Sequence, residues 1–406
     1  MDPRALRIAD FTYDLPSGRI AQHPLDERES SNLLVLRDGR ISDHRFGSLA
    51  AHLPEGALLV LNDTRVVKAR IVFHRSTGAR IECMVLEPEG GRPMETALQD
   101  RGKSRWWCMV GNAKRWTGDQ LTVGKGSNIL RAERKEHLDG EHLVEFTWDS
   151  VASFSEMLAQ HGDVPLPPYM KRSTDHDDPV RYNTVFAERD GSVAAPTASL
   201  HFTPAVLRSL EEKRIGMAKV TLHVGAGTFL PVKADRMEGH TMHSEQVRIP
   251  RATVQLLHDA LGKSPIVAVG TTALRTIESL CWFGDDLLSG RSTEGLHVSQ
   301  WRPYEREPGD TSASLEAVLR WMDDRVVDEV TGQTSLMIAP GYRFRLAAGL
   351  VTNFHQPGST LLLLVAAFIG NDWRKVYDHA LANHYRFLSY GDGSLLWRKA
   401  DRPGGY

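Results

Sequence analysis

The sequence predicts an α/β main domain that is interrupted by an inserted all-β domain. Several short apolar runs end in small polar residues and are followed by helical stretches. This pattern is typical of strands that are buried on both faces of an α/β sheet or barrel. Residues 66–148 differ, because they hold short alternating runs separated by Gly and Asp, which indicates a small all-β barrel. We therefore expect residues 1–65 and 149–406 to form the main domain.

The predicted buried strands share a run of Val, Leu, Ile or Ala that ends in polar residues. They lie in residues 57–65, 217–228, 265–275 and 348–360. In α/β folds the ligand site lies beyond the carboxyl ends of the strands, so we expect the polar residues at these ends to converge on one cleft. These residues are Asn62, Asp63, Thr64, Arg65, His223, Thr271, Thr272, Asn353, Phe354 and His355.

Helical stretches follow several of the predicted strands. Residues 271–280 open with two threonines, which are good N-cap residues, and residues 359–368 open with a serine. Residues 372–387 are amphipathic. Residues 282–333 are more polar than their flanks, and we expect them to form a surface excursion that contains a helix.

The amino-acid composition indicates the cellular compartment of the protein and the kinds of partner that it can bind. The net charge is −2, so any nucleic-acid binding requires a local basic surface. The three cysteines are widely spaced, which favours buried thiols in a reducing compartment. The N-terminus has no apolar leader, and the most apolar run, residues 360–370, is too short to cross a bilayer. We expect a cytoplasmic protein without membrane contact.

A glycine loop follows His223 in the stretch "TLHVGAGTF". It lacks the helix that a dinucleotide-binding fingerprint requires. Two interpretations remain open. Gly225 and Gly227 form a tight turn, or they let a ligand approach the backbone closely.

The nearby stretch "HTMHSE" gathers His240, His243 and Glu245. On a helix, these residues could hold zinc. In a loop, they are either polar surface residues or a metal-free acid–base pair, since histidine titrates near neutral pH.

Two further segments have a functional and a structural interpretation. Arg275 lies near the predicted helix start, where free N–H groups bind anions, but it could instead form an exposed ion pair with Glu278. Tyr169 precedes Lys171 and Arg172 in a proline-rich segment. This segment is either a rigid loop or a surface that stacks on a base and pairs with phosphate.

Nine blocks of sequence, from Asp10 to Leu396, carry a resemblance that covers nearly the whole chain. Among the longest are "DFTYDLPSGRIAQHPLDERESSNLLVL", "RYNTVFAERDGSVAAPTASLHFT", "VTLHVGAGTFLPV" and "LVTNFHQPGSTLLLLVAAFIG". Together they resemble the S-adenosylmethionine:tRNA ribosyltransferase-isomerases of queuosine biosynthesis. The resemblance implies a barrel-like α/β domain with an inserted all-β domain.

The resemblance also implies an activity. The enzyme would move the ribosyl part of S-adenosylmethionine onto 7-aminomethyl-7-deazaguanine at the tRNA wobble position and isomerise it. The product would be epoxyqueuosine, and adenine and methionine would leave. S-adenosylmethionine would be a consumed substrate, with no bound cofactor and no metal. The anticodon stem-loop of tRNA would be the partner, and no obligate protein partner is expected.

The implied chemistry suggests roles for the polar residues. The sulfonium acidifies the ribose C5′ protons, so a base must remove one of them. We expect His223, His243 and Glu245 to transfer protons and Asp63 to hold the acceptor amine. The remaining candidates would bind substrate. Four of them would hold the methionyl carboxylate or a phosphate, namely Arg65, Thr271, Thr272 and Arg275, and two would line the ribose or adenine, namely Asn353 and His355. The other expected substrate-binding residues are Asn62, Tyr169, His201, Gly225 and Gly227.

Several positions depart from the family pattern. They are Asn32, Lys68, Asn183, Ser199 and Gln356. These departures leave open a paralogue with another acceptor or a non-catalytic RNA binder. A metallohydrolase using the histidines and Glu245 is a further alternative. The tRNA surface is expected to comprise Arg65, Lys68, Arg70, Arg75, Arg80, Lys114, Arg115, Lys171 and Arg172.

Overall fold

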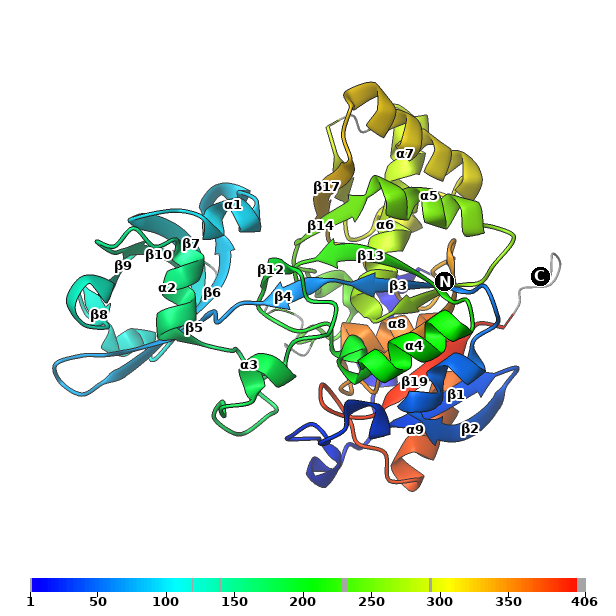
Figure 1. The fold of residues 1–406 in the computed structure, drawn as a ribbon, viewed down its shortest axis with the longest axis horizontal. Coiled ribbons are helices and arrows are strands. Elements are labelled where there is room, and N and C mark those ends of the chain that lie inside the picture. Colours follow the sequence, from blue (N-terminus) through cyan, green and yellow to red (C-terminus); the bar gives the residue numbers. More distant parts are fainter. Residues whose placement is uncertain are drawn as a thin grey trace.

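The computed structural model contains a large mixed sheet flanked by helices and a separate antiparallel sheet (Figure 1). It describes residues 2–118, 120–138, 140–225, 227, 232–291 and 294–399. The α/β class with an inserted all-β domain is confirmed.

The main sheet has ten strands. Their spatial order is β16 (Leu296–Val298), β17 (Glu329–Thr334), β14 (Glu245–Pro250), β13 (Gly216–Leu222), β3 (Leu58–Asn62), β15 (Ile266–Val269), β18 (Ala347–Asn353), β19 (Gly393–Trp397), β1 (Asn32–Arg37) and β2 (Arg40–Arg45). The four central strands, β13, β3, β15 and β18, are parallel. β14 and β19 run antiparallel to their central neighbours. In the described part of the chain the end strands β16 and β2 are not paired with each other.

The strand β3 shows why its sequence is an unbroken apolar run. Leu58 and Val60 pack into the core on one face of the sheet, whereas Leu59 and Leu61 pack into the core on the other face. Successive side chains of a strand point to opposite faces, so a strand that is covered on both sides needs no polar alternation. The prediction of strands buried on both faces is confirmed for this strand.

Helices cover both faces of the main sheet. The helices on the first face are α5 (Arg251–Ala260), α6 (Thr271–Leu288), α7 (Thr311–Arg325), α8 (Thr360–Ile369) and α9 (Asp372–Ala382). The second face is covered by α4 (Pro204–Glu212) and the 3-10 helix Phe46–His52. The short α3 (Asp178–Arg181) lies outside these layers. None of the described helices is long and apolar enough to cross a membrane.

The helix starts differ in one respect from the sequence prediction. The hydroxyl of Ser359 accepts a hydrogen bond from the backbone N–H of Leu362 and caps α8 as expected. The N-cap of α6 is instead Gly270, at φ 91°, and no side chain caps that helix. Both threonines fall inside the helix because only glycine adopts the required backbone conformation without strain.

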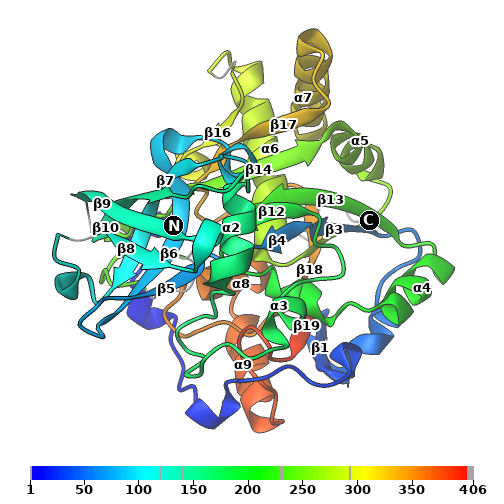
Figure 2. The same ribbon diagram turned by 60° about the vertical axis from the view of Figure 1, so that its left-hand side comes forward.

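The inserted region forms an antiparallel half-barrel. The order of its strands is β11 (Gly162–Asp163), β5 (Arg70–His74), β6 (Arg80–Pro88), β7 (Lys103–Gly111), β10 (Glu141–Thr147), β9 (Leu130–Leu138) and β8 (Leu121–Val123). Two helices pack against it, α1 (Met94–Leu98) and α2 (Phe154–His161). Figure 2 brings the half-barrel forward, with α2 beside its strands. Cys83 and Cys108 lie in its core as free thiols, which agrees with the expectation of buried cysteines.

A two-stranded ribbon lies between the half-barrel and the main sheet. It consists of β4 (Thr64–Val66) and β12 (Arg189–Ser192), which pair in parallel (Figure 1). The chain enters the half-barrel from β4, directly after β3. The polar residues at the end of β3 are therefore continuous with the connection to the inserted region.

Residues 282–333 are more integrated than the expected surface excursion. Trp282 and Phe283 are buried because α6 continues to Leu288 rather than ending near 280. Two strands of this segment, β16 and β17, extend the main sheet. Some of the charged side chains that make this segment polar are buried in ion pairs and are not exposed to solvent.

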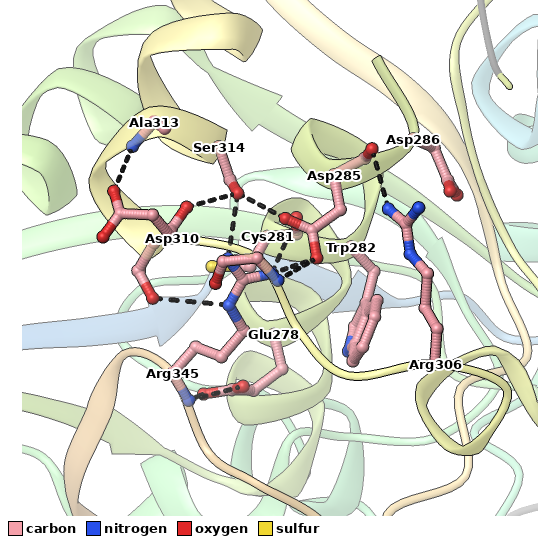
Figure 3. Close-up of polar contacts among 12 residues, drawn as sticks. Glu278, Cys281, Trp282, Asp285, Asp286, Arg306, Asp310, Ala313, Ser314 and Arg345 are labelled. Atoms are coloured by element: carbon pink, nitrogen blue, oxygen red, sulfur yellow. Dashed lines mark hydrogen bonds and ion pairs between the residues drawn. The ribbon is translucent and has the colours of Figure 1, made fainter. Parts of the chain in front are cut away.

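A buried ion pair between Asp285 on α6 and Arg345 anchors this segment (Figure 3). The two side chains are 1% and 3% exposed, and the Nη1 of Arg345 lies 2.9 Å from Oδ2 of Asp285. Ser314 on α7 donates its hydroxyl to Asp285 and accepts from Arg345. The cluster thus joins α6, α7 and the chain leading into β18.

Glu278, about two helical turns nearer the start of α6 than Asp285, closes the other side of the same cluster. Its carboxylate accepts hydrogen bonds from the backbone N–H groups of residues 345–347 and from the hydroxyl of Tyr342. The alternative interpretation, an exposed ion pair between Glu278 and Arg275, is wrong, because both side chains are buried and have other partners.

We predict that Arg345→Met lowers the free energy of unfolding by about 3–5 kcal/mol, because it leaves Asp285 buried without its cation. The matched control is Arg343→Met. Arg343 pairs with Glu307, and these side chains are 69% and 74% exposed, so the control should change little. Urea unfolding followed by circular dichroism measures both variants. Equal midpoints for the two variants would contradict the importance of the buried pair.

Candidate active site

Three adjacent cavities lie at the carboxyl edge of the central parallel strands. Cavity A is lined by the start of α6 and by residues that follow β18, among them Thr271, Asn353 and His355. Cavity B, of about 260 Å³, includes Arg275 and His240, and cavity C, of about 200 Å³, includes His223. Cavities B and C share four lining residues, which are Gly225, Gly227, His243 and Glu245. Val224 lines both A and C.

Cavity A receives the uncapped start of α6. Thr271 and Thr272 line it in the first turn, where backbone N–H groups have no intrahelical partner. Tyr169 and Ser389 line it as well, and their hydroxyl oxygens lie 2.5 Å apart. The start of the helix therefore presents a positive dipole end to the cavity.

Asn353 and His355 continue the wall of cavity A beyond β18. The amide oxygen of Asn353 accepts a hydrogen bond from the hydroxyl of Thr197, at 2.8 Å. The Nε2 of His355 lies 2.8 Å from the hydroxyl of Thr352. Burial lowers the pKa of His355 to about 4, so this side chain is a neutral hydrogen-bonding group rather than a cation.

Arg275 and Glu245 form a buried ion pair in the wall of cavity B. Their side chains are 7% and 5% exposed. The Nε of Arg275 donates to the backbone oxygen of Leu336, at 3.1 Å. Its Nη2 has no hydrogen-bond partner among the described residues. This guanidinium in the wall of cavity B therefore retains one unused donor nitrogen, which is buried.

Gly227 and His243 show how closely the glycine loop approaches the cavities. A Cβ atom at Gly227 would lie 2.1 Å from Cδ2 of His243, so a larger residue would require the His243 ring to shift. This close contact is with a side chain of the same chain, and the approach of a ligand to the glycines stays a prediction. Ala226 and residues 228–231 of the loop lie outside the described residues.

His223 lies in the wall of cavity C, and its Nδ1 is 2.9 Å from the hydroxyl of Thr64. The Thr64 hydroxyl donates to Ser192, at 2.9 Å, so it accepts from His223. This chain of hydrogen bonds places the imidazole proton on Nδ1 and leaves a lone pair on Nε2. The Nε2 atom is buried and has no hydrogen-bond partner among the described residues.

The environment of His223 keeps the imidazole neutral. Burial, followed by the charges of Arg248 and Arg189, lowers the pKa of His223 to about 4. A neutral Nε2 with a free lone pair can accept a proton at neutral pH. The arrangement can therefore serve proton abstraction in cavity C.

Four predicted site residues are not among the residues that line cavities A to C. Asn62 is fully buried and bonds to Leu222 and Thr272. The carboxylate of Asp63 accepts from Thr221, and burial raises the pKa of Asp63. The partners of Arg65 are Asp190 and Ala187. His201 packs on Phe46, and burial lowers the pKa of His201 to about 4.

The basic residues expected to bind tRNA are largely paired within the chain. Arg172 makes two hydrogen bonds to the buried carboxylate of Asp178, at 2.6 and 2.7 Å. Arg70 and Arg80 both pair with Glu82. Such residues contribute less to a phosphate-binding surface than unpaired cations do.

The histidines of "HTMHSE" do not lie on a helix. Residues 241–244 form a loop, and Glu245 begins β14. Within the residues that the structure describes, no group of three His, Cys, Asp or Glu side chains is placed to hold a metal ion. The helical arrangement that motivated a zinc site is therefore wrong.

Sequence reasoning missed three residues near the cavities. Glu95 belongs to the inserted region, yet its Oε1 lies 3.9 Å from Nε2 of His223. Gln246 lines cavity C, and Gln356, one of the departures from the family pattern, lines cavity A. Gln356 follows His355 directly and could have been suspected, whereas no local signal placed Glu95 beside His223.

Known proteins resemble this chain over nearly its full length. A family model described as queuosine biosynthesis protein matches residues 8–396. The S-adenosylmethionine:tRNA ribosyltransferase-isomerase of Magnetococcus marinus is 37% identical over 98% of this chain and 96% of its own length. The protein of the same name from Azoarcus sp. is 39% identical over 97% of this chain and 98% of its own length.

A crystal structure is also similar. It is that of an S-adenosylmethionine tRNA ribosyltransferase from Thermotoga maritima, with 28% identity, a TM-score of 0.46, and coverage of 95% of this chain and 99% of that chain. On the family match and the two relatives, this chain belongs to the queuosine biosynthesis protein family, which includes S-adenosylmethionine:tRNA ribosyltransferase-isomerases.

Proposed function

We propose that this protein is an S-adenosylmethionine:tRNA ribosyltransferase-isomerase that forms epoxyqueuosine on tRNA. The relatives that are 37% and 39% identical over almost the entire chain carry this activity in their names. The observation that supports a catalytic role most directly is the environment of His223. His223 is a neutral imidazole in the wall of a cavity at the ends of the parallel strands, and its buried Nε2 has no hydrogen-bond partner among the described residues.

The first chemical step uses His223 as a base. The positive sulfur of S-adenosylmethionine acidifies the hydrogens on the adjacent C5′ carbon. One C5′–H bond breaks, its proton passes to Nε2 of His223, and the electron pair stays on carbon. His243 and Glu245, which line cavities B and C beside His223, would return or relay protons when adenine leaves.

The methionyl end of the substrate would occupy cavity B. Arg275 keeps one guanidinium nitrogen without a partner among the described residues, and a carboxylate is the natural acceptor for it. The ion pair with Glu245 holds the guanidinium in place. Cavity A, with Asn353, His355 and the start of α6, would then receive the ribose and adenine or an anionic group.

The tRNA partner would place its wobble base at cavity C. Asp63 stays a predicted partner of the acceptor amine, although its carboxylate is contacted by Thr221. Lys114, Arg115 and Lys171 remain candidates for phosphate contacts, which would make the affinity fall as salt rises. Cytoplasmic tRNA is the expected substrate pool.

We predict that the protein releases adenine from S-adenosylmethionine only when an anticodon stem-loop bearing 7-aminomethyl-7-deazaguanine is present. His223→Gln should slow this release by about 100-fold or more, because it removes the proton acceptor. His258→Gln, on α5 and outside the three cavities, is the control and should keep the rate. Chromatography of adenine measures both. A wild-type protein that releases no adenine would contradict the proposed function, whereas an active His223→Gln would contradict only the assignment of the base.

The low pKa of His223 predicts an unusual pH dependence. The base works when it is neutral, and its pKa is about 4 rather than the ordinary 6.5. The rate of adenine release should therefore not fall with His223 protonation between about pH 8 and about pH 5, whereas an ordinary histidine would lose activity near pH 6.5. The rate is measured across this range, with circular dichroism at each pH to verify folding. A loss of activity centred near pH 6.5 in the folded protein, if it persists in His243→Gln, would contradict a neutral buried His223.

A further inference from the structure

The helix α1 of the inserted region is held beside His223 by Gln246. The side-chain oxygen of Gln246 accepts from the backbone N–H of Met94, at 2.9 Å, and its Nε2 donates to the backbone oxygen of Arg92, at 2.9 Å. The backbone oxygen of Gln246 accepts from the N–H of His223, at 3.0 Å. One residue of β14 thus fixes the start of α1 and the backbone of His223 relative to each other.

Gly191 lies against both the ring of His223 and Met94 of this helix. A Cβ atom at Gly191, where φ is 147°, would lie 2.8 Å from two atoms of the His223 ring and 2.7 Å from Cγ of Met94. Only glycine allows this approach. The imidazole and the first turn of α1 therefore meet at Gly191.

Four charged side chains form a closed ring next to His223. Arg248 contacts Glu95 at 3.1 Å and Glu329 at 2.9 Å. Arg189 contacts Glu329 on one side and Glu95, at 3.7 Å, on the other. Each side chain comes from a different element, namely α1, β14, β17 and β12. Of the two carboxylates in the ring, Glu95 has an oxygen 3.9 Å from Nε2 of the imidazole.

The gap between Glu95 and His223 leaves two polar atoms unsatisfied. Oε1 of Glu95 and Nε2 of His223 are 3.9 Å apart, which is too long for a hydrogen bond. Both atoms are buried without a hydrogen-bond partner among the described residues. With a lone pair on Nε2, the two acceptors have no proton to share. A proton taken up by Nε2 would make the ring positive and place it beside the Glu95 carboxylate, an electrostatic attraction that the neutral ring lacks.

Resting on the proposed function above, we propose that Glu95 is a positioning residue that acts on the reaction through His223: a carboxylate supplied by the inserted region whose charge stabilises the imidazolium once Nε2 has taken the C5′ proton. The charges that face the imidazole are then Glu95, Arg189 and Arg248. The two arginines disfavour the imidazolium, and Glu95 compensates for them only at the moment of proton transfer. The inserted region therefore takes part in the chemistry and does not serve only as a tRNA contact.

The test compares Glu95→Gln with Glu329→Gln in the full-length protein. Each variant removes one carboxylate from the same ring and leaves the same two arginines, but only Glu95 faces His223. Adenine release is followed with the modified stem-loop and either ordinary S-adenosylmethionine or S-adenosylmethionine deuterated at C5′. Thermal unfolding establishes that both variants are folded.

We expect Glu95→Gln to lower kcat by about tenfold or more with little change in KM, and to increase the deuterium isotope effect because proton transfer becomes slower. Glu329→Gln should keep the isotope effect of the wild type. Wild-type kcat and isotope effect in Glu95→Gln would overturn the proposal, and so would equal losses in the two variants without a larger isotope effect. If the wild type itself releases no adenine, the proposed function fails instead.

Discussion

The side chain of Asn62 joins the three elements on which the candidate site depends. Its amide oxygen accepts from the N–H of Leu222 and of Thr64, and its amide nitrogen donates to the oxygen of Leu222 and the hydroxyl of Thr272. The ends of β3 and β13, the start of α6 and the entry to the inserted region are therefore fixed by one buried amide. A fully satisfied buried network of this kind favours a single arrangement of its members.

This arrangement makes two regions of the chain meet at His223. The parallel strands bring their carboxyl ends to one edge, which supplies His223, Thr271, Arg275 and Asn353. The half-barrel, which leaves the main sheet directly after β3, returns α1 to the same edge. The buried cluster of Glu278, Asp285 and Arg345 then fixes the far end of α6. The site is thus built from a rigid sheet, one long helix and one helix of the inserted region.

The sequence was sufficient for the parts of the fold that depend on local pattern. Unbroken apolar runs predicted the strand β3, and a run of leucines after Ser359 predicted α8. The convergence of polar strand ends followed from the parallel topology, and Thr271, Asn353 and His355 do share a cavity. Charge content was misleading where ions are buried, because the buried side chains of Asp285, Asp286 and Arg302 made the segment 282–333 resemble a surface. The approach of Glu95 to His223 depends on packing between distant segments, which no local pattern encodes.

The most direct measurement of the central claim is a crystal structure of the protein with S-adenosylmethionine bound. The account predicts that the C5′ carbon lies within about 4 Å of Nε2 of His223, close enough for proton transfer. It also predicts that the methionyl carboxylate accepts from Arg275 in cavity B. A ligand whose C5′ carbon lies far from His223, with its carboxylate away from Arg275, would contradict the assignment of the base and of cavity B together.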